Sequence, residues 1–176
     1  GHGRVIDHMF FDGLEDAYAK GRLMGTFAED AAAHFGFTRD AQDDYALASL
    51  DRSLKAISSG AFAGEVVPVV TKAATIAIDE QPGKAKRDKI RMLKPAFRDG
   101  GTVTAANSSS ISDGAAALTL MRMSEAEKRG LTPLAVVKGH AGHAAEPAWF
   151  TTAPVGAMQK LLARVGWSTG DVDLWE

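Results

Sequence analysis

The polar residues best suited to bind a ligand gather in one stretch near the middle of the chain. Residues 107–112 read Asn-Ser-Ser-Ser-Ile-Ser, and alanine and glycine residues lie on both sides, at 100–106 and 114–117. Amide and hydroxyl groups in a loop suit polar recognition, and small residues let a ligand or another backbone segment approach closely. A flexible Ser/Gly-rich linker is the alternative. We favour the binding loop because residues with strand propensity flank it at 102–104 and 118–120.

A second group is cationic and comes before this loop. Residues 84–91 include Lys84, Lys86, Arg87, Lys89 and Arg91. Charge alone favours a solvated loop. Clustered cations also attract phosphate groups, so a phosphorylated ligand is the alternative.

Other residue types limit the chemistry. The sequence has no cysteine, which excludes a disulfide, a thiolate metal site and a thiol nucleophile within these residues. His140 and His143 share a loop, but no matched carboxylate pattern accompanies them, so hydrogen-bonded or exposed imidazoles are favoured over a zinc site. Gly101 and Gly114 lack the Gly-Lys-Ser/Thr ending of a phosphate loop. These residues alone indicate an α/β protein with an anionic ligand.

Size and charge restrict the class of protein further. A chain of 176 residues can bury one core or parts of two. The 20 basic and 22 acidic residues give a net charge of -2, which argues against a general nucleic-acid binder. No apolar run approaches the ~18 residues of a membrane span, and no signal peptide opens the sequence. We therefore expect a cytoplasmic protein with no nucleic-acid or membrane partner.

Helices are predicted to dominate the first half. Thr26 to Glu29 has the pattern of a capping box and predicts a helix that stops at Gly36. Thr38 predicts the start of a longer helix to about Ser58, ended by Gly60. An apolar stripe on that helix consists of Leu47, Leu50, Leu54 and Ile57. Residues 65–70 predict a strand, with Pro68 at an edge or end.

Strands alternate with helices in the predicted second half. Ser124 to Glu127 predicts a second capping box on a short helix that Gly130 closes. Residues 133–139 predict a buried strand, and a helix is expected between Pro154 and Gly166. Residues 172–174 predict the start of another strand. This order predicts a βαβ unit with parallel strands.

The motifs of the chain, taken together, resemble the thiolase family of acetyl-CoA acetyltransferases. Three segments carry most of the resemblance: Lys-Pro-Ala-Phe at 94–97, Gly-Thr-Val-Thr-Ala-Ala-Asn at 101–107 and Ser-Asp-Gly-Ala-Ala-Ala at 112–117. Motifs at 12–17, 24–25, 38–43, 154–167 and 171–174 follow in the family's order. The implied fold class is an α/β, thiolase-like fold. A mostly helical inserted loop domain (1–96) would precede parts of an αβαβα layered core, split into 97–131 and 132–176.

This resemblance implies a coenzyme A-dependent acyltransferase that condenses or cleaves acyl-CoA thioesters through an acyl-cysteine. The family's catalytic cysteines, histidine and Asn-Glu-Ala-Phe asparagine have no counterpart in these residues, so we expect them outside the sequence. The chain by itself is then expected to be inactive, with no catalytic residue and no metal ligand of its own. The acyl-CoA is substrate, no resident cofactor is expected, and a homodimer or homotetramer is implied. A non-catalytic coenzyme A-binding or protein-interaction module is the alternative, because cysteine is absent.

The resemblance also implies which residues contact the coenzyme A thioester. Motif positions assign this role to Leu14, Met24, Lys84, Phe97, Ala105, Ser109, Ser110 and Ile111. Loop 107–110 would bind the pantetheine arm, while Phe97 and Met24 would supply apolar walls. For Phe97 and Ile111 an ordinary core position is the alternative. Leu23 stands where many short-chain members have histidine, Ser110 where many have glycine, and Gly83, beside Lys84, where the family has arginine.

Overall fold

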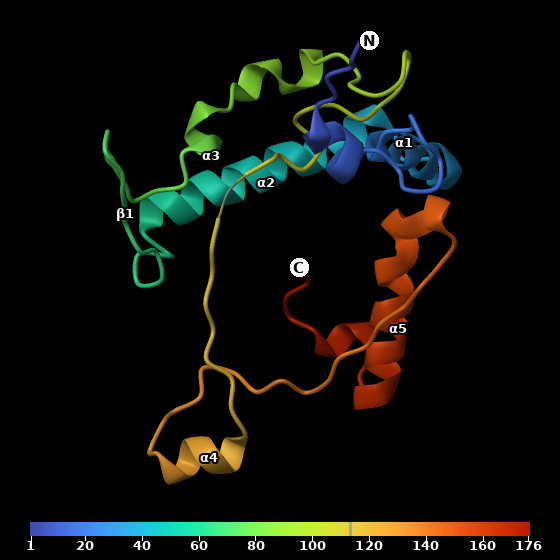
Figure 1. Ribbon diagram of the computed structural model, residues 1–176. Helices are drawn as coiled ribbons and strands as arrows, with labels where there is room; N and C mark the ends of the chain where they lie inside the picture. Colours follow the sequence, from blue (N-terminus) through green and yellow to red (C-terminus); the bar gives the residue numbers. More distant parts are fainter. Residues whose placement is uncertain (113) are drawn as a thin grey trace. The chain divides into compact units, whose positions relative to one another are not determined.

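Residues 1–110 and residues 111–176 form separate units in the computed structural model, which describes residues 1–112 and 114–176 (Figure 1). Asp113, in the predicted Ser-Asp-Gly motif, lies outside the described residues. Within the described part of the chain, no helix is long and apolar enough to cross a membrane. The domain boundaries expected after residues 96 and 131 stay predictions.

Two helices, α1 (Met24–Phe35) and α2 (Arg39–Ser59), are the main elements of the first unit. Gly36 ends α1 with φ +69°, a left-handed conformation that glycine adopts without steric cost. The Thr38 hydroxyl accepts a hydrogen bond from the Ala41 amide at 3.2 Å, and Gly60 ends α2. These predicted helix ends are confirmed.

The start predicted for α1 is wrong. The helix begins at Met24 with Leu23 at its N-cap, and Thr26 lies inside, where its hydroxyl donates to the Leu23 carbonyl at 2.7 Å. Glu29 does not fold back onto a cap. Its carboxylate accepts the amide N–H groups of Thr102 and Val103, because this distant segment offers it several donors at once.

A small hairpin and two short helices follow α2. Strands β1 (Val69–Val70) and β2 (Thr75–Ile76) pair antiparallel, with Val69 opposite Ile76. Only the last two residues of the predicted strand 65–70 are therefore paired. Helix α3 (Gln81–Lys84) and the 3₁₀ helix η2 (Arg87–Met92) then pack against α2. Near the N-terminus lies a π-helix, η1 (Met9–Leu14).

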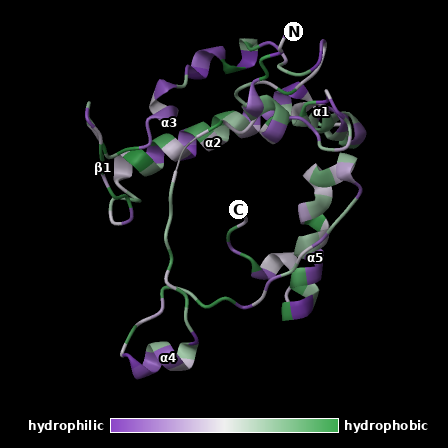
Figure 2. Cartoon of the chain, viewed as in Figure 1, coloured by the Kyte–Doolittle hydropathy of each residue, from purple (hydrophilic) through white to green (hydrophobic). Residues whose placement is uncertain are grey.

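The core of the first unit is small and partly polar. Its buried apolar residues are Phe27, Ala31, Ala32, Ile90 and Val103. Hydrophilic and hydrophobic residues alternate along α2 (Figure 2), and Leu54 of its predicted apolar stripe is 37% exposed. The buried residue of α2 is Asp43 instead, at 1% exposure.

The second unit is built from helices and extended segments. Helix α4 (Met123–Lys128) forms as a short helix, but Arg122 is its N-cap without a side-chain hydrogen bond, so the predicted capping box is wrong. The 3₁₀ helix η3 (Pro147–Thr152) leads into α5 (Ala153–Val165). Pro154 in the first turn of α5 and Gly166 at its end confirm those predictions. A last 3₁₀ turn, η4, spans Thr169–Asp171.

An extended segment at 139–143 packs along α5. A Cβ atom added at Gly139 would lie 2.9 Å from Val165 Cγ1, so any larger residue here would have to displace that side chain. Arg164 donates to the His140 carbonyl, and Lys160 Nζ donates to the Gly142 carbonyl at 3.4 Å.

The strands predicted for the second unit are wrong as local structure. Residues 133–139 and 172–174 are not strands, and no β-pairing involves the described residues of 111–176. Val137 is 74% exposed and Leu174 is 81% exposed. A strand is stable only beside hydrogen-bonded neighbours, and the βαβ unit lacks them here.

Candidate functional site

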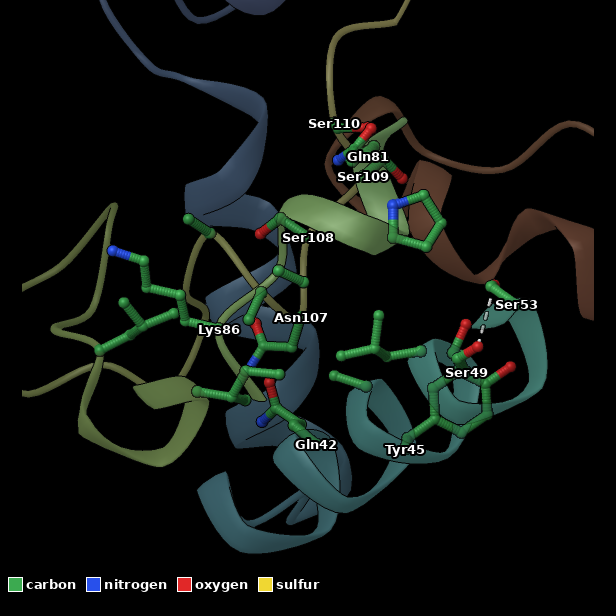
Figure 3. A pocket seen from close by; sticks show the side chains of 18 of the residues that line it. Gln42, Tyr45, Ser49, Ser53, Gln81, Lys86, Asn107, Ser108, Ser109 and Ser110 are labelled. Carbon is green, nitrogen blue, oxygen red and sulfur yellow. Dashed lines mark hydrogen bonds between the residues drawn. The ribbon is translucent and has the colours of Figure 1, made fainter. Parts of the chain in front are cut away.

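A cavity of about 1050 Å³ lies in the first unit, close to the upper limit of roughly 1,000 Å³ for ligand-binding pockets. Three segments line it: one face of α2, residues 79–93 and the polar loop 105–110 (Figure 3). The polar residues that line it are Gln42, Tyr45, Ser49, Ser53, Asp79, Gln81, Lys86, Lys89, Asn107, Ser108, Ser109 and Ser110, of which Figure 3 labels ten. The cavity thus brings the predicted binding loop and the cationic segment to one place.

The polar loop is held by its own side chains. Asn107 Oδ1 accepts the Thr104 amide N–H at 2.7 Å, and Asn107 Nδ2 donates to the Thr102 carbonyl at 3.1 Å. Buried Thr104 accepts the Ala106 amide N–H with its hydroxyl at 3.2 Å. The Ser108 hydroxyl donates back to the Thr104 carbonyl at 2.7 Å. Such a set of bonds fixes a loop and argues against a flexible linker.

Glu29 anchors the strand-like segment that leads into this loop. Glu29 is 4% exposed, and its carboxylate accepts hydrogen bonds from the amides of Thr102 and Val103 at 2.9 and 2.8 Å. Gly101 makes this approach possible, because an added Cβ would overlap the Glu29 carboxylate and lie 2.9 Å from the Arg98 carbonyl oxygen. Val103 and Thr104 are consequently buried.

The arginines of the cationic segment are turned onto α2. Both guanidinium contacts of Arg87 reach Asp51, at 2.9 and 3.0 Å, and the hydrogen bond from Arg87 holds the pKa of Asp51 below its ordinary value. Arg91 pairs with Asp44. These two arginines therefore hold the cationic segment against α2.

Among the residues that the structure describes, the three lysines of the cationic segment do not pair with α2 as its arginines do. Lys84 Nζ lies 3.5 Å from a carboxylate oxygen of Glu80, and both side chains are largely exposed. Lys86 and Lys89 line the cavity. Asp79 also lines the cavity, so these two lysines are the cationic part of a lining that carries both charges.

The structure places the eight predicted binding residues in different surroundings. Ala105, Ser109 and Ser110 line the cavity, and Ser110 Oγ donates to Gln81 Oε1 at 2.9 Å. The other five do not line it. Leu14 is half-buried in η1, and Lys84 is exposed in α3. Met24 and Phe97 lie near the start of α1, and Ile111 is the first residue of the second unit, with 68% exposure.

Phe97 has its own close contact. A Cβ atom at Gly25 would overlap three ring carbons of Phe97, so the ring lies directly against the first turn of α1. Met24, 40% exposed, is the neighbouring residue of that turn. Both residues therefore belong to the region around the first turn of α1, and neither lines the cavity.

Sequence reasoning missed the buried carboxylates that support the site. The capping-box pattern assigns Glu29 to a helix cap, and Asp43 falls outside the apolar stripe of α2; both residues are buried. Asp43 does belong to the 38–43 motif, whose agreement with a family pattern was the one available signal. Lys86 and Lys89 were recognised only as members of a cationic run.

Solved acetyl-CoA acetyltransferases share this fold. The chain superimposes on the acetyl-CoA acetyltransferase of Bacillus anthracis with a TM-score of 0.90 and 37% identity, over 99% of this chain and 45% of that one. A structure described as the Acat5 thiolase of Ascaris suum in complex with coenzyme A gives 0.93 and 36%, over 99% of this chain and 46% of that one. The fold is therefore part of a thiolase fold, as the motifs predict.

Sequence comparison identifies the family. Residues 1–124 match the family described as "Thiolase, N-terminal domain". Acetyl-CoA acetyltransferase 2 of Arabidopsis thaliana is 44% identical over 183 residues, covering all of this chain and 45% of that protein. The Escherichia coli acetyl-CoA acetyltransferase is 44% identical over 181 residues and is covered to 46%. The chain belongs to the thiolase family, and it spans about half the length of these relatives.

Proposed function

We propose that this chain is part of a coenzyme A-dependent acyltransferase that condenses or cleaves acyl-CoA thioesters. Family membership supports the class of reaction. The observation that carries the assignment is the cavity that the Asn107–Ser110 loop lines together with Lys86 and Lys89. It offers hydroxyl and amide groups to a pantetheine arm and cations to phosphates within one space.

In this proposal the residues of the chain bind and orient the substrate. Ser109 and Ser110 hydrogen-bond the pantetheine arm, with Ala105 beside them. Phe97 and Met24 provide an apolar wall, while Leu14, Lys84 and Ile111 contribute from positions outside the cavity lining. The acyl-cysteine forms on polypeptide outside these residues, because the 176 residues contain no thiol.

The activity is tested with the natural full-length polypeptide that carries this sequence. Purified protein should cleave acetoacetyl-CoA in the presence of coenzyme A. The loss of the enolate absorbance of acetoacetyl-CoA measures this cleavage. The 176-residue chain alone should show no cleavage, because it contains no cysteine to form the acyl-enzyme. No cleavage by the full-length polypeptide with any short acyl-CoA would refute the acyltransferase proposal.

The role of the two cavity lysines has a separate test by calorimetry. Replacing both Lys86 and Lys89 by alanine should weaken coenzyme A binding about tenfold or more, because charge-assisted contacts to phosphate are lost. Binding of pantetheine, which lacks the nucleotide, should change little. Lys72→Ala is the matched control, since Lys72 is exposed, does not line the cavity and has no proposed contact with coenzyme A. Equal losses for both ligands would contradict a phosphate role.

A non-catalytic coenzyme A-binding or protein-interaction module is the second candidate, supported by the absence of cysteine. The mass of the natural protein discriminates the two candidates. A native product of 18.6 kDa that binds coenzyme A without cleaving acetoacetyl-CoA would favour the module.

A further inference from the structure

Asp43 is a charged side chain buried at a point where several segments meet. It is 1% exposed, whereas its sequence neighbours Gln42 and Asp44 are accessible. Its two carboxylate oxygens are used by different partners. Oδ2 accepts from Arg39 Nε at 2.7 Å, and Oδ1 accepts from Asn107 Nδ2 at 3.3 Å.

Each partner of Asp43 continues to a wall of the cavity. Arg39 Nη2 donates to the Leu93 carbonyl at 2.8 Å, which ties residues 90–93 to α2. Asn107 binds the Thr102 carbonyl and the Thr104 amide, which sets the shape of the polar loop. Ile90, Leu93 and Asn107 all line the cavity. One carboxylate therefore connects two cavity walls that lie on separate segments of the chain.

The chemistry of this position fits a role in orientation. A buried carboxylate is costly unless its partners satisfy it, and here both oxygens are satisfied. An isosteric amide at position 43 would keep the volume. It would also turn an NH₂ group toward either Arg39 or Asn107, which are both donors at these contacts. The two walls would then lose their common anchor without a cavity being created.

We propose that Asp43 is a positioning residue for coenzyme A binding. It acts through Arg39 and Asn107 to fix residues 90–93 of one cavity wall relative to the polar loop 105–110. The inference rests on the proposed function for the identity of the ligand. Asp43 itself need not touch the ligand.

The test compares Asp43→Asn with Asp44→Asn in the natural full-length polypeptide. Asp44 is the adjacent carboxylate of α2 and pairs with Arg91 at the surface. Asp43→Asn should raise the Kd for coenzyme A and the KM for acetoacetyl-CoA about tenfold, with kcat within about twofold, since the groups that react lie elsewhere. Asp44→Asn should leave all three values within about twofold. A loss of thermal stability with unchanged Kd and KM would overturn the proposal.

Exchanging the two side chains between positions 43 and 107 tests whether coenzyme A affinity can be recovered. Asn107→Asp alone places two carboxylates together and should weaken binding more than Asp43→Asn does. The double variant with Asp43→Asn and Asn107→Asp restores a donor and an acceptor between these positions, and should recover at least about threefold in Kd relative to Asn107→Asp. Additive losses in the double variant would contradict the proposed coupling.

Amide hydrogen exchange separates this inference from the proposed function. The Thr104 amide is bonded by Asn107, so in ligand-free protein Asp43→Asn should speed its exchange about tenfold relative to Asp44→Asn. If unmodified protein fails to bind coenzyme A, the proposed function fails. A faster exchange at Thr104 would still support positioning of the loop by Asp43, and an unchanged exchange would overturn it.

Discussion

The two units of the chain are stabilised by contacts of different range. In the first unit, buried carboxylates join positions far apart in the sequence, as Glu29 joins Val103 and Asp43 joins Asn107. In the second unit, the contacts of α5 are with a neighbouring extended segment, for example Arg164 with the His140 carbonyl. The ligand-sized cavity lies in the first unit, where a loop is fixed by residues outside it. The comparison indicates that long-range polar anchors, rather than a large apolar core, shape the candidate site.

The largest effect is expected at Glu29. Glu29→Ala removes the acceptor for two buried amides, those of Thr102 and Val103, and should lower the free energy of unfolding by about 3 kcal/mol. Urea denaturation measures this. Glu125→Ala in the second unit removes an exposed ion pair with Arg129 and should cost below about 1 kcal/mol. Equal costs would break the contrast between the units.

A smaller effect is expected at Gly25. Gly25→Ala places a methyl group against the Phe97 ring and should destabilise the protein by about 2 kcal/mol, as overpacking does. The ring must move, so acyl-CoA affinity should also fall if Phe97 forms a wall of the site. Gly13→Ala is the control, because an added Cβ there meets no atom within 4 Å. A neutral Gly25→Ala would show that the contact with Phe97 is not tight.

The stability of the first unit should depend modestly on pH through Asp30. Hydrogen bonds from Arg98 and Arg22 hold the pKa of Asp30 below its ordinary value. Stabilisation from a lowered pKa is complete above the unfolded-state value and is lost as pH falls through the folded-state value. Asp30→Asn should therefore lower the thermal midpoint at about pH 7, and the difference from the unmodified protein should shrink below about pH 4. A difference independent of pH would exclude this contribution.

The smallest effect is expected at Gly156 in the second unit. An added Cβ would lie 2.6 Å from the imidazole of His143, but that side chain is exposed and can rotate away. Alanine also favours the helix by roughly 1 kcal/mol over glycine. Gly156→Ala should thus change the free energy of unfolding by less than about 0.5 kcal/mol. A loss like that at Gly25 would mean that the second unit is packed as tightly as the first.

Local signals in the sequence were enough to find most helix ends. Gly36, Gly60 and Gly166 end helices, and Thr38 caps α2, because capping depends on a few adjacent residues. The strands at 133–139 and 172–174 were predicted wrongly, because pairing depends on segments elsewhere. Family motifs supplied the thiolase fold, which single-residue patterns did not.

The candidate site was predictable only in part for the same reason. The polar loop and the cations are visible as runs of similar residues. Glu29 bonds to Thr102 and Val103, and Asp43 bonds to Asn107, all more than sixty residues away, so no local pattern reveals these partners. Lys86 and Lys89 line the cavity while Arg87 forms an ion pair, and this difference likewise depends on the positions of the aspartates on α2.

The bond between Glu29 and the Val103 amide spans 74 positions and encloses the β1–β2 hairpin. The entropy of closing such a loop grows only with the logarithm of its length, so doubling the enclosed chain costs roughly 0.6 kcal/mol. Relatives can therefore lengthen or shorten the hairpin with little penalty to the anchored segment.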